Sequence, residues 1–397
     1  MRRRSAPLSA LALLVVTSGV AANGCQPPAA PPPEPPGCLL DSAGPPEESA
    51  YVLDRAANEV VVINPRDCEL TKRIPVGVDP VAANATASGS HVFVANRGSN
   101  TVSIIETVSK KVIKTLDVGE QPDALRFNTR HDILWVHNAG SGTFSLIDIR
   151  EQEVVGTIDV GPGAHRMAMN ERYPYKAYLS DAAAGTVEVI DTSDYASVAT
   201  IPVGASPRAL EFSAQSEKVY VCSGTDAPGI DVIPTEGAAA DLVTKRIALE
   251  APCHEIAFDR TERWGFALVP DRDEVVIIDA DTDEIAATVA VGTRPDKVVF
   301  PKDCAVIANG LSPDVSIIHA ESFEEIDRIE TGAGLSSPEG DRSLRDSLDG
   351  HHVYIPNPGA GTVTILDSAT REVRGTVHVG GQPSVVVVAG PSGGSCC

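Results

Sequence analysis

The chain has 397 residues, of which 43% are hydrophobic and 22% charged, and its formal net charge is −22. This length accommodates two ordinary domains or one large repeat array. Because so acidic a surface repels nucleic acid and anionic lipid, both are excluded as expected partners.

Residues 1–24 are predicted to be an export signal. They carry three arginines near the start, an apolar run from about Leu8 to Val16, and small residues before Cys25. The apolar run is shorter than the roughly 20 residues that span a bilayer. The segment "AANGC" resembles a bacterial lipobox, which implies lipidation of Cys25. The sequence therefore predicts an exported lipoprotein, periplasmic or at the cell surface, that contacts the membrane only through its lipid anchor. Secretion with plain cleavage of the signal is the alternative.

Residues 25–49 are predicted to form a linker. The stretch from Gln26 to Gly37 is dense in proline, and such stretches favour a stiff, extended backbone. A folded body is expected over 50–390, followed by a flexible tail over 391–397. A stiff linker behind a lipid anchor would hold the body away from the membrane.

Residues 50–390 contain eight similar blocks, each with two strand-forming segments rich in β-branched residues. The first segments lie at 50–54, 92–96, 134–138, 177–181, 219–223, 265–269, 305–309 and 353–357, and nearly all carry an aromatic second residue. The second segments lie at 59–64, 101–106, 143–148, 186–191, 229–234, 274–279, 314–319 and 362–367. An all-β unit that recurs about every 43 residues is typical of a propeller blade.

A third strand in each block ends at a mark that is glycine in seven of the eight blocks. The marks are Gly77, Gly119, Gly161, Gly204, Glu250, Gly292, Gly332 and Gly380. Most are followed by a proline and a fourth strand, as in "PDALRF" at 122–127, while Ala164 and Cys253 take the place of that proline in their blocks. We interpret this segment as the hinge between blades, because glycine admits a close turn and proline fixes φ.

The predicted fold class is all-β, a single β-propeller of eight four-stranded blades. The final strand at 383–388 has no block after it, so it is expected to pair with the first blade and close the ring. Seven blades are the alternative, which requires discarding a matching block. The segment 333–351 is poorly apolar and predicts a loop insertion in its blade.

The blocks resemble the YVTN family of propeller repeats. The segments "TVSIIE", "TVEVID" and "TVTILD", with the Val-Gly-x-x-Pro hinge, carry the resemblance over nearly all of 50–390. It implies the propeller fold and an exported or surface-attached protein, and it assigns no chemistry.

Eight cysteines in an exported protein permit disulfides, but spacing does not reveal the pairing. Cys38 and Cys68 could meet the final pair, Cys396 and Cys397, if the termini meet. The alternative is that the final pair belongs to a disordered tail.

Several conspicuous residues are interpreted as structural because they recur at equivalent positions. The acidic segment 279–284 has the spacing of a calcium loop but aligns with the ordinary hairpin turn of other blocks. Polar residues that end the first strands are interpreted as turn residues: Asp54, Asn96, Asn138, Asp181, Asn309 and Asn357. One column of the fourth strand is interpreted as packing between blades: Phe127, Met169, Phe212, Phe258 and Phe300.

The position directly after the hinge proline varies from block to block and is expected near one mouth of the central channel. Charged or titratable residues occupy this position or the next in five consecutive blades. The candidate ligand-binding residues are Asp123, His165, Arg166, Arg208, His254, Glu255, Asp296 and Lys297. The alternatives are an ordinary solvated channel mouth, or metal or haem ligation through His165 or His254, for which spacing fixes no third ligand. The other histidines are interpreted as incidental, and no cofactor is identified.

No common catalytic, nucleotide-binding or zinc motif occurs in the chain. The leading hypothesis is a non-catalytic binding or scaffold module of the cell envelope that presents a propeller face to an envelope protein or a small ligand. The alternative is a periplasmic enzyme or a cofactor or metal carrier, comparable to haem-d1, lactonase or lyase propellers. A structural brick of a surface layer is the third possibility.

Overall fold

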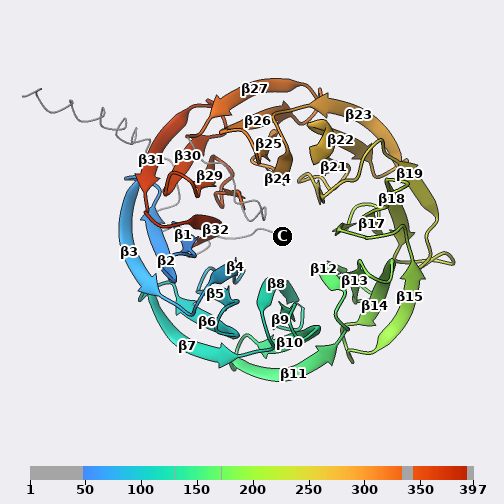
Figure 1. The fold of residues 1–397 in the computed structure, drawn as a ribbon, viewed down its shortest axis with the longest axis horizontal. Coiled ribbons are helices and arrows are strands. Elements are labelled where there is room, and N and C mark those ends of the chain that lie inside the picture. The colour runs from blue at the N-terminus through green and yellow to red at the C-terminus, as the bar shows by residue number, and fades with distance from the viewer. Residues whose placement is uncertain (1–47, 129, 171, 333–342, 391–397) are drawn as a thin grey trace, which may run out of the picture. The chain divides into compact units, whose positions relative to one another are not determined.

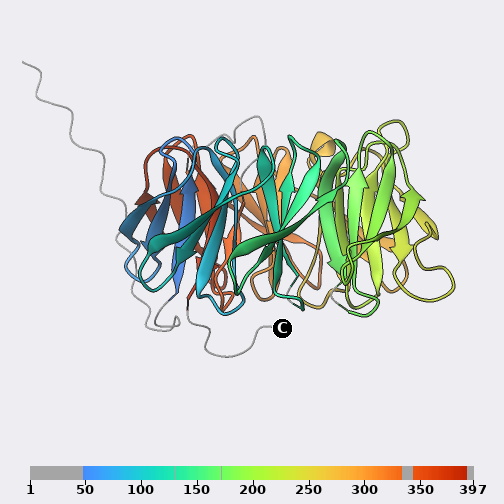
Figure 2. The same cartoon turned by 90° about the horizontal axis from the view of Figure 1, so that it is seen from below.

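Eight four-stranded antiparallel sheets surround a central channel in this computed structural model (Figure 1). The structure describes residues 48–128, 130–170, 172–332 and 343–390, which belong to a unit spanning Pro35–Cys397. The predicted export signal, Cys25, the linker up to residue 47 and the tail 391–397 lie outside the described residues. The strands of each blade run between two loop-bearing faces of the ring (Figure 2).

We number the blades 1 to 8 in chain order and give their strands from the rim to the channel. Blade 1 consists of β3(Glu69–Pro75), β2(Glu59–Asn64), β1(Ser49–Asp54) and β32(Pro383–Ala389), and blade 2 of β7(Lys111–Asp117), β6(Thr101–Glu106), β5(His91–Asn96) and β4(Pro80–Ala85). Blade 3 consists of β11(Glu153–Asp159), β10(Thr143–Asp148), β9(Ile133–Asn138) and β8(Pro122–Asn128), and blade 4 of β15(Ser197–Pro202), β14(Thr186–Asp191), β13(Lys176–Asp181) and β12(Ala164–Asn170). Blade 5 consists of β19(Lys245–Ala248), β18(Gly229–Pro234), β17(Lys218–Ser223) and β16(Ala209–Ser213), and blade 6 of β23(Glu284–Ala290), β22(Glu274–Asp279), β21(Trp264–Val269) and β20(Glu255–Phe258). Blade 7 consists of β27(Glu325–Glu330), β26(Asp314–His319), β25(Cys304–Asn309) and β24(Pro295–Val299), and blade 8 of β31(Val373–His378), β30(Thr362–Asp367), β29(His352–Asn357) and β28(Arg345–Asp346).

The eight-blade prediction and the predicted closure are confirmed. The last strand, β32, pairs antiparallel with β1, with Val52 opposite Val386, and supplies the innermost strand of blade 1. The ring therefore has no open edge between its first and last blades. Seven blades are excluded because each of the eight blocks forms its own sheet.

The hydrophobic core is divided among the blade interfaces. Eight clusters of buried side chains occur in the described residues, one between each pair of neighbouring blades. Between blades 2 and 3, for example, Phe93 and Ile104 pack with Leu134. The predicted packing column is confirmed here as well, because the Phe127 ring meets Phe93 edge-on at 5.7 Å.

The hinges contain the close backbone turns that the glycines predicted. A Cβ added to Gly119 would lie 2.5 Å from Ser141 Oγ, closer than such atoms can approach. Gln121 then adopts a positive φ of 53°, and Pro122 begins β8. This tight turn moves the chain from the rim strand β7 of one blade to the innermost strand of the next.

The strand-end residues are structural, as predicted. Asn138 donates through Nδ2 to Ser145 Oγ at 3.0 Å and to Thr143 Oγ1 at 3.1 Å, both on the paired strand β10. In the acidic segment 279–284, Asp279 accepts from Arg263 at 2.8 Å and Asp283 pairs with Lys218 at 2.9 Å. These contacts support the hairpin interpretation of that segment.

Blade 8 departs from the regular pattern. Its innermost strand β28 has two residues, and Ser343 forms a parallel bridge to Val385 of β32. Part of the predicted insertion, 333–342, lies outside the described residues. Within the described ranges, the one helix is the 3-10 turn η1(Pro270–Arg272), and no helix is suited to crossing a bilayer.

The cysteines form a pairing that spacing did not reveal. Cys222 of β17 is bonded to Cys253, the residue that replaces the hinge proline before β20. Cys68 is also disulfide-bonded, and Cys304 is a buried free thiol. Cys38, Cys396 and Cys397 lie outside the described residues.

Candidate ligand-binding site

A β-bulge at the start of the innermost strands positions the predicted mouth residues. In blade 3, Pro122 pairs with Asn138 and Ala124 with His137, which leaves Asp123 as the extra residue. In blade 5, both Arg208 and Ala209 face Cys222, whose carbonyl accepts from the Arg208 N–H at 2.9 Å. A bulge redirects a side chain out of the regular alternation, so these residues escape the packed blade interface.

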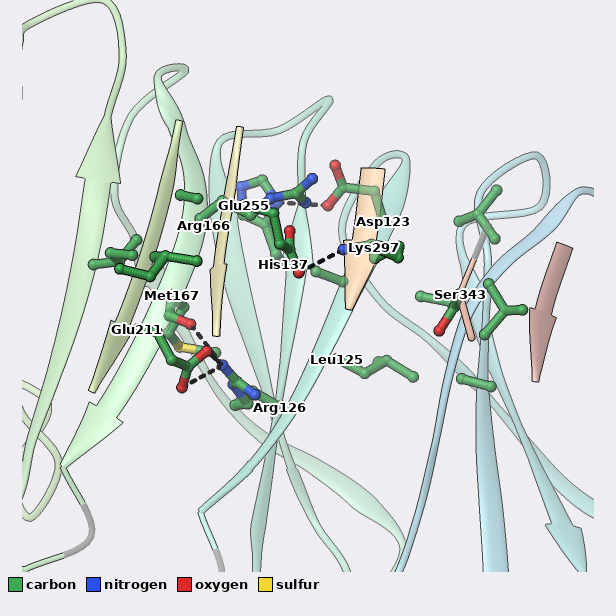
Figure 3. A pocket seen from close by; sticks show the side chains of 18 of the residues that line it. Asp123, Leu125, Arg126, His137, Arg166, Met167, Glu211, Glu255, Lys297 and Ser343 are labelled. Carbon is green, nitrogen blue, oxygen red and sulfur yellow. Dashed lines mark hydrogen bonds and ion pairs between the residues drawn. The ribbon is translucent and has the colours of Figure 1, made fainter. Parts of the chain in front are cut away.

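The channel contains a pocket of about 360 Å³ to which all eight blades contribute (Figure 3). Its polar side comes from blades 3 to 7 and its apolar side from blades 1 and 2. The apolar side consists of Val81, Ala82 and Ala83 of blade 2 and Val385 of blade 1. The pocket is therefore amphipathic, with charge confined to one arc of its wall.

The charged side chains lie at two levels, and the upper level is nearer the hinges. There, Lys297 Nζ lies 2.8 Å from Glu255 Oε1, and His137 Nδ1 lies 2.6 Å from Asp123 Oδ1. The fifth charged or titratable group at this level is Arg166, on β12 (Figure 3). Its guanidinium has no hydrogen bond or ion pair with any described residue, while both carboxylates at this level have partners.

The lower level is a single ion pair that reaches across a blade. Arg126 Nη2 of β8 lies 3.1 Å from Glu211 Oε2 of β16, and 3.4 Å from the Met167 carbonyl of the intervening β12 (Figure 3). This pair ties three blades together deeper in the channel than the mouth residues.

A second recess of about 500 Å³ opens at the mouth beside the pocket and shares Asp123 and Arg166 with it. Arg208 and His254 complete its polar lining, with Arg208 Nη1 3.4 Å from His254 Nε2. Burial, and then the Arg208 guanidinium, hold the pKa of His254 below its usual range. His254 is therefore neutral at pH 7, and the positive charge of this pair resides on Arg208.

The structure brings most of the predicted site residues together. Asp123, Arg166, Glu255 and Lys297 line the pocket, and Arg208 and His254 line the adjoining recess. Asp296 lines neither cavity, and the side chain of His165 is outside the described part of the structure. A ligand role for the whole set stays a prediction.

Three further residues belong to the site but were not predicted. Arg126 and Glu211 occupy one repeated position, four residues after the hinge, where blades 4 and 6 have alanine. The available signal was a charge at a position that is uncharged in blades 1, 2, 4, 6 and 7. His137 was interpreted as incidental with the other histidines, yet it is buried and contacts Asp123.

The pocket wall presents an oriented imidazole together with several charged side chains. Asp123 orients His137 as a carboxylate orients a general base. Among the described residues that line the pocket, the one hydroxyl or thiol side chain is that of Ser343, on the opposite wall (Figure 3), and Ser206 lines the adjoining recess. Across the described residues, no group of three His, Cys, Asp or Glu side chains is arranged to hold a metal ion.

No family model matches the chain, and no curated protein sequence matches it. Solved structures do resemble it. A dihydro-heme d1 dehydrogenase, NirN, in complex with DHE has a TM-score of 0.70 at 15% identity, covering 85% of this chain and 74% of NirN. Apo AztD from Citrobacter koseri has a TM-score of 0.68 at 16% identity, covering 88% and 99%. A functionally unknown protein from Desulfotomaculum acetoxidans has a TM-score of 0.60 at 12% identity, covering 87% and 99%. At these identities the likeness shows only that the chain shares the β-propeller fold of these proteins.

Proposed function

We propose that this protein is a non-catalytic binding protein for a small organic carboxylate, held at the hinge-side mouth of the channel. One observation carries the proposal: the pocket carboxylates Asp123, Glu211 and Glu255 all have cationic or imidazole partners, whereas Arg166 and Arg208 have no carboxylate partner among the described residues.

The electrostatics favour an anion at this mouth. A guanidinium presents a planar set of N–H donors that matches a carboxylate, and charge-assisted hydrogen bonds are the stronger ones. The chain as a whole is strongly acidic, with a net charge of −22. Arg166 and Arg208, which have no carboxylate partner in the described part of the chain, therefore form a local positive site on a protein that otherwise repels anions.

The shape of the pocket favours a ligand with an apolar body. A volume of about 360 Å³ lies within the range of small-molecule sites, and Val81, Ala82, Ala83 and Val385 supply an apolar wall. A carboxylate at Arg166 and Arg208 would direct its hydrocarbon part toward that wall. Burial of this part contributes free energy without further polar contacts.

We also propose that the protein works outside the cytoplasm as a lipoprotein anchored through Cys25. The disulfide between Cys222 and Cys253 supports this location, because such bonds persist in oxidising compartments. A tethered carrier exchanges its ligand with a neighbour, so the predicted envelope protein partner is part of the same proposal.

The test begins with native mass spectrometry of the full chain purified from its own cells, which would reveal a retained small acid. Isothermal titration calorimetry then uses octanoate, a monocarboxylate with an apolar body. We expect Arg166→Ala and Arg208→Ala each to weaken octanoate binding by about tenfold, because a hydrogen bond to a charged group contributes roughly 1.5–3 kcal/mol.

Arg328→Ala is the matched control, since Arg328 lies on the rim strand β27 and pairs with Glu325. The control should bind octanoate as the unaltered protein does. Absence of octanoate binding by the unaltered protein, or equal affinities in all three variants, would overturn the proposal. Equal binding of inorganic phosphate would contradict the role assigned to the apolar wall.

A cofactor carrier is the second candidate. It is supported by the likeness to a dihydro-heme d1 dehydrogenase in complex with DHE, and by His137 and His254 at the mouth. The same mass spectrum, together with a visible absorption spectrum, distinguishes a bound tetrapyrrole from a small acid.

A further inference from the structure

The Cys222–Cys253 disulfide crosses the junction between blades 5 and 6 directly behind the channel mouth. Its two Cα atoms are 5.6 Å apart, and both residues are buried in a cluster that includes Ala209 and Ile256 of the innermost strands. The bond therefore lies in the packed interface that supports the mouth, out of contact with solvent.

Each half of the disulfide is directly connected to one mouth residue. The Cys222 carbonyl accepts the N–H of Arg208 at 2.9 Å, and His254 follows Cys253 in the chain. The N–H of His254 is in turn held by the Leu268 carbonyl at 3.0 Å. Arg208 and His254 belong to different blades, so the crosslink spans the same junction as their 3.4 Å contact.

The backbone restrains the junction between blades 5 and 6 less than it restrains the junctions whose innermost strands have the usual length. The rim strand β19 and the innermost strand β20 contain four residues each, and among the described strands β28 alone is shorter. The hinge between them has Cys253 where most hinges have proline. A covalent bond to the preceding blade replaces the stiffness that proline provides elsewhere.

We propose that this disulfide is a positioning element of the carboxylate site, which holds Arg208 and His254 in register across the junction of blades 5 and 6. The inference rests on the proposed function above. Loss of the bond is expected to let the two side chains separate while the rest of the propeller stays folded, since the other seven interfaces do not depend on it.

The test uses Cys222→Ala/Cys253→Ala, which removes the bond without leaving a buried thiol unpaired. Cys304→Ala is the matched control, because it truncates a buried thiol in β25, away from this junction. Circular dichroism checks the fold, calorimetry measures octanoate affinity, and NMR titration follows the His254 ring, assigned with His254→Ala. The groups that act on His254 are Arg208 and Arg294, which lower its pKa, and Asp271, which raises it.

We expect the double variant to keep its β-sheet signal, to shift the His254 pKa upward toward its usual value, and to bind octanoate several-fold more weakly. The control should match the unaltered protein in all three measurements. A folded double variant with an unchanged His254 pKa and unchanged affinity would overturn the inference.

Two further outcomes are separable. If the double variant fails to fold, Cys222→Val/Cys253→Ala restores the buried volume with a residue suited to a strand. Failure of that variant to fold as well would show that the bond is needed for folding and would overturn the positioning role. If the unaltered protein does not bind octanoate but the His254 pKa still shifts in the double variant, the proposed function fails and the positioning of the pair stands.

Discussion

Single residues at repeated positions decide the chemistry of the channel. The second residue after the hinge is small or apolar in blades 1, 2, 3 and 5, but it is Arg166, Glu255 or Lys297 in blades 4, 6 and 7. The repeat thus supplies the same backbone site many times, and substitution on a few blades makes one arc of the wall polar. The opposite arc keeps the small apolar residues of the repeat.

Carboxylate binding should depend on pH through His254. Its pKa lies below the usual range, so the ring is neutral at pH 7 and gains a proton as the pH falls. The protonated ring adds a positive charge beside Arg208, and a bound carboxylate favours that form by linkage. We expect octanoate affinity to rise from pH 8 to pH 5.5.

Calorimetry at a series of pH values and a constant ionic strength would measure this dependence. His254→Gln, which cannot be protonated, should show a flatter profile over the same range. A profile identical to that of the unaltered protein would assign the pH dependence to another group.

At the scale of strands, a Lys-x-Tyr pattern links neighbouring blades. Tyr220 Oη donates to Asp283 at 2.7 Å, and Lys218 Nζ lies 2.9 Å from the same carboxylate. Lys176 and Tyr178 bind Asp241 of the next blade in the same way. The aromatic column of the first strands therefore joins blades through its hydroxyl groups as well as through its rings.

Removing one of these hydroxyl groups should destabilise the ring modestly. Tyr220→Phe keeps the ring packed but leaves Asp283 with Lys218 alone. We expect the free energy of unfolding to fall by about 1.5–3 kcal/mol, the usual contribution of a hydrogen bond to a charged group. Urea denaturation would measure it, with Tyr173→Phe at an exposed tyrosine as the control that should show no loss.

At the scale of the whole ring, closure involves side chains as well as β32. Glu48 Oε1 accepts from Tyr354 Oη at 2.8 Å, and Glu48 Oε2 accepts from the Leu348 N–H at 3.0 Å. These contacts join the start of blade 1 to blade 8, about 300 residues away in sequence. Burial raises the pKa of Glu48.

Glu48→Ala should destabilise the ring by about 2 kcal/mol, because two buried donors lose their acceptor. Glu48→Gln keeps one acceptor and should lose less. Since the folded pKa of Glu48 is raised, its stabilising contribution is complete below its unfolded pKa and declines as the pH rises through the folded value.

Urea denaturation between pH 4.5 and 8 would therefore show the unaltered protein losing stability relative to Glu48→Gln as the pH rises. A difference between the two proteins that did not change with pH would mean that Glu48 does not titrate differently in the folded and unfolded states.

The sequence by itself determined the blades, the hinges and the closure of the ring. Blades 2 to 8 are meanders in which neighbouring strands are consecutive in the chain, so strand pattern and turn residues specify them locally, and blade 1 differs only in receiving β32 as its innermost strand. The same local information separated structural residues such as Asn138 from candidate site residues such as Asp123. It also placed six of the eight predicted site residues around the mouth, because the position after the hinge has the same geometry in each blade.

Only the tertiary structure decided the contacts between blades and the contact of His137 with Asp123 within blade 3. Arg126 and Glu211 meet although they are 85 residues apart, and Cys222 bonds to Cys253 in the next blade. His137 reaches Asp123 because a bulge shifts the register between two adjacent strands. Repeat periodicity describes each blade alone, whereas partners across the channel and across blade junctions depend on how the closed ring sets the blades side by side.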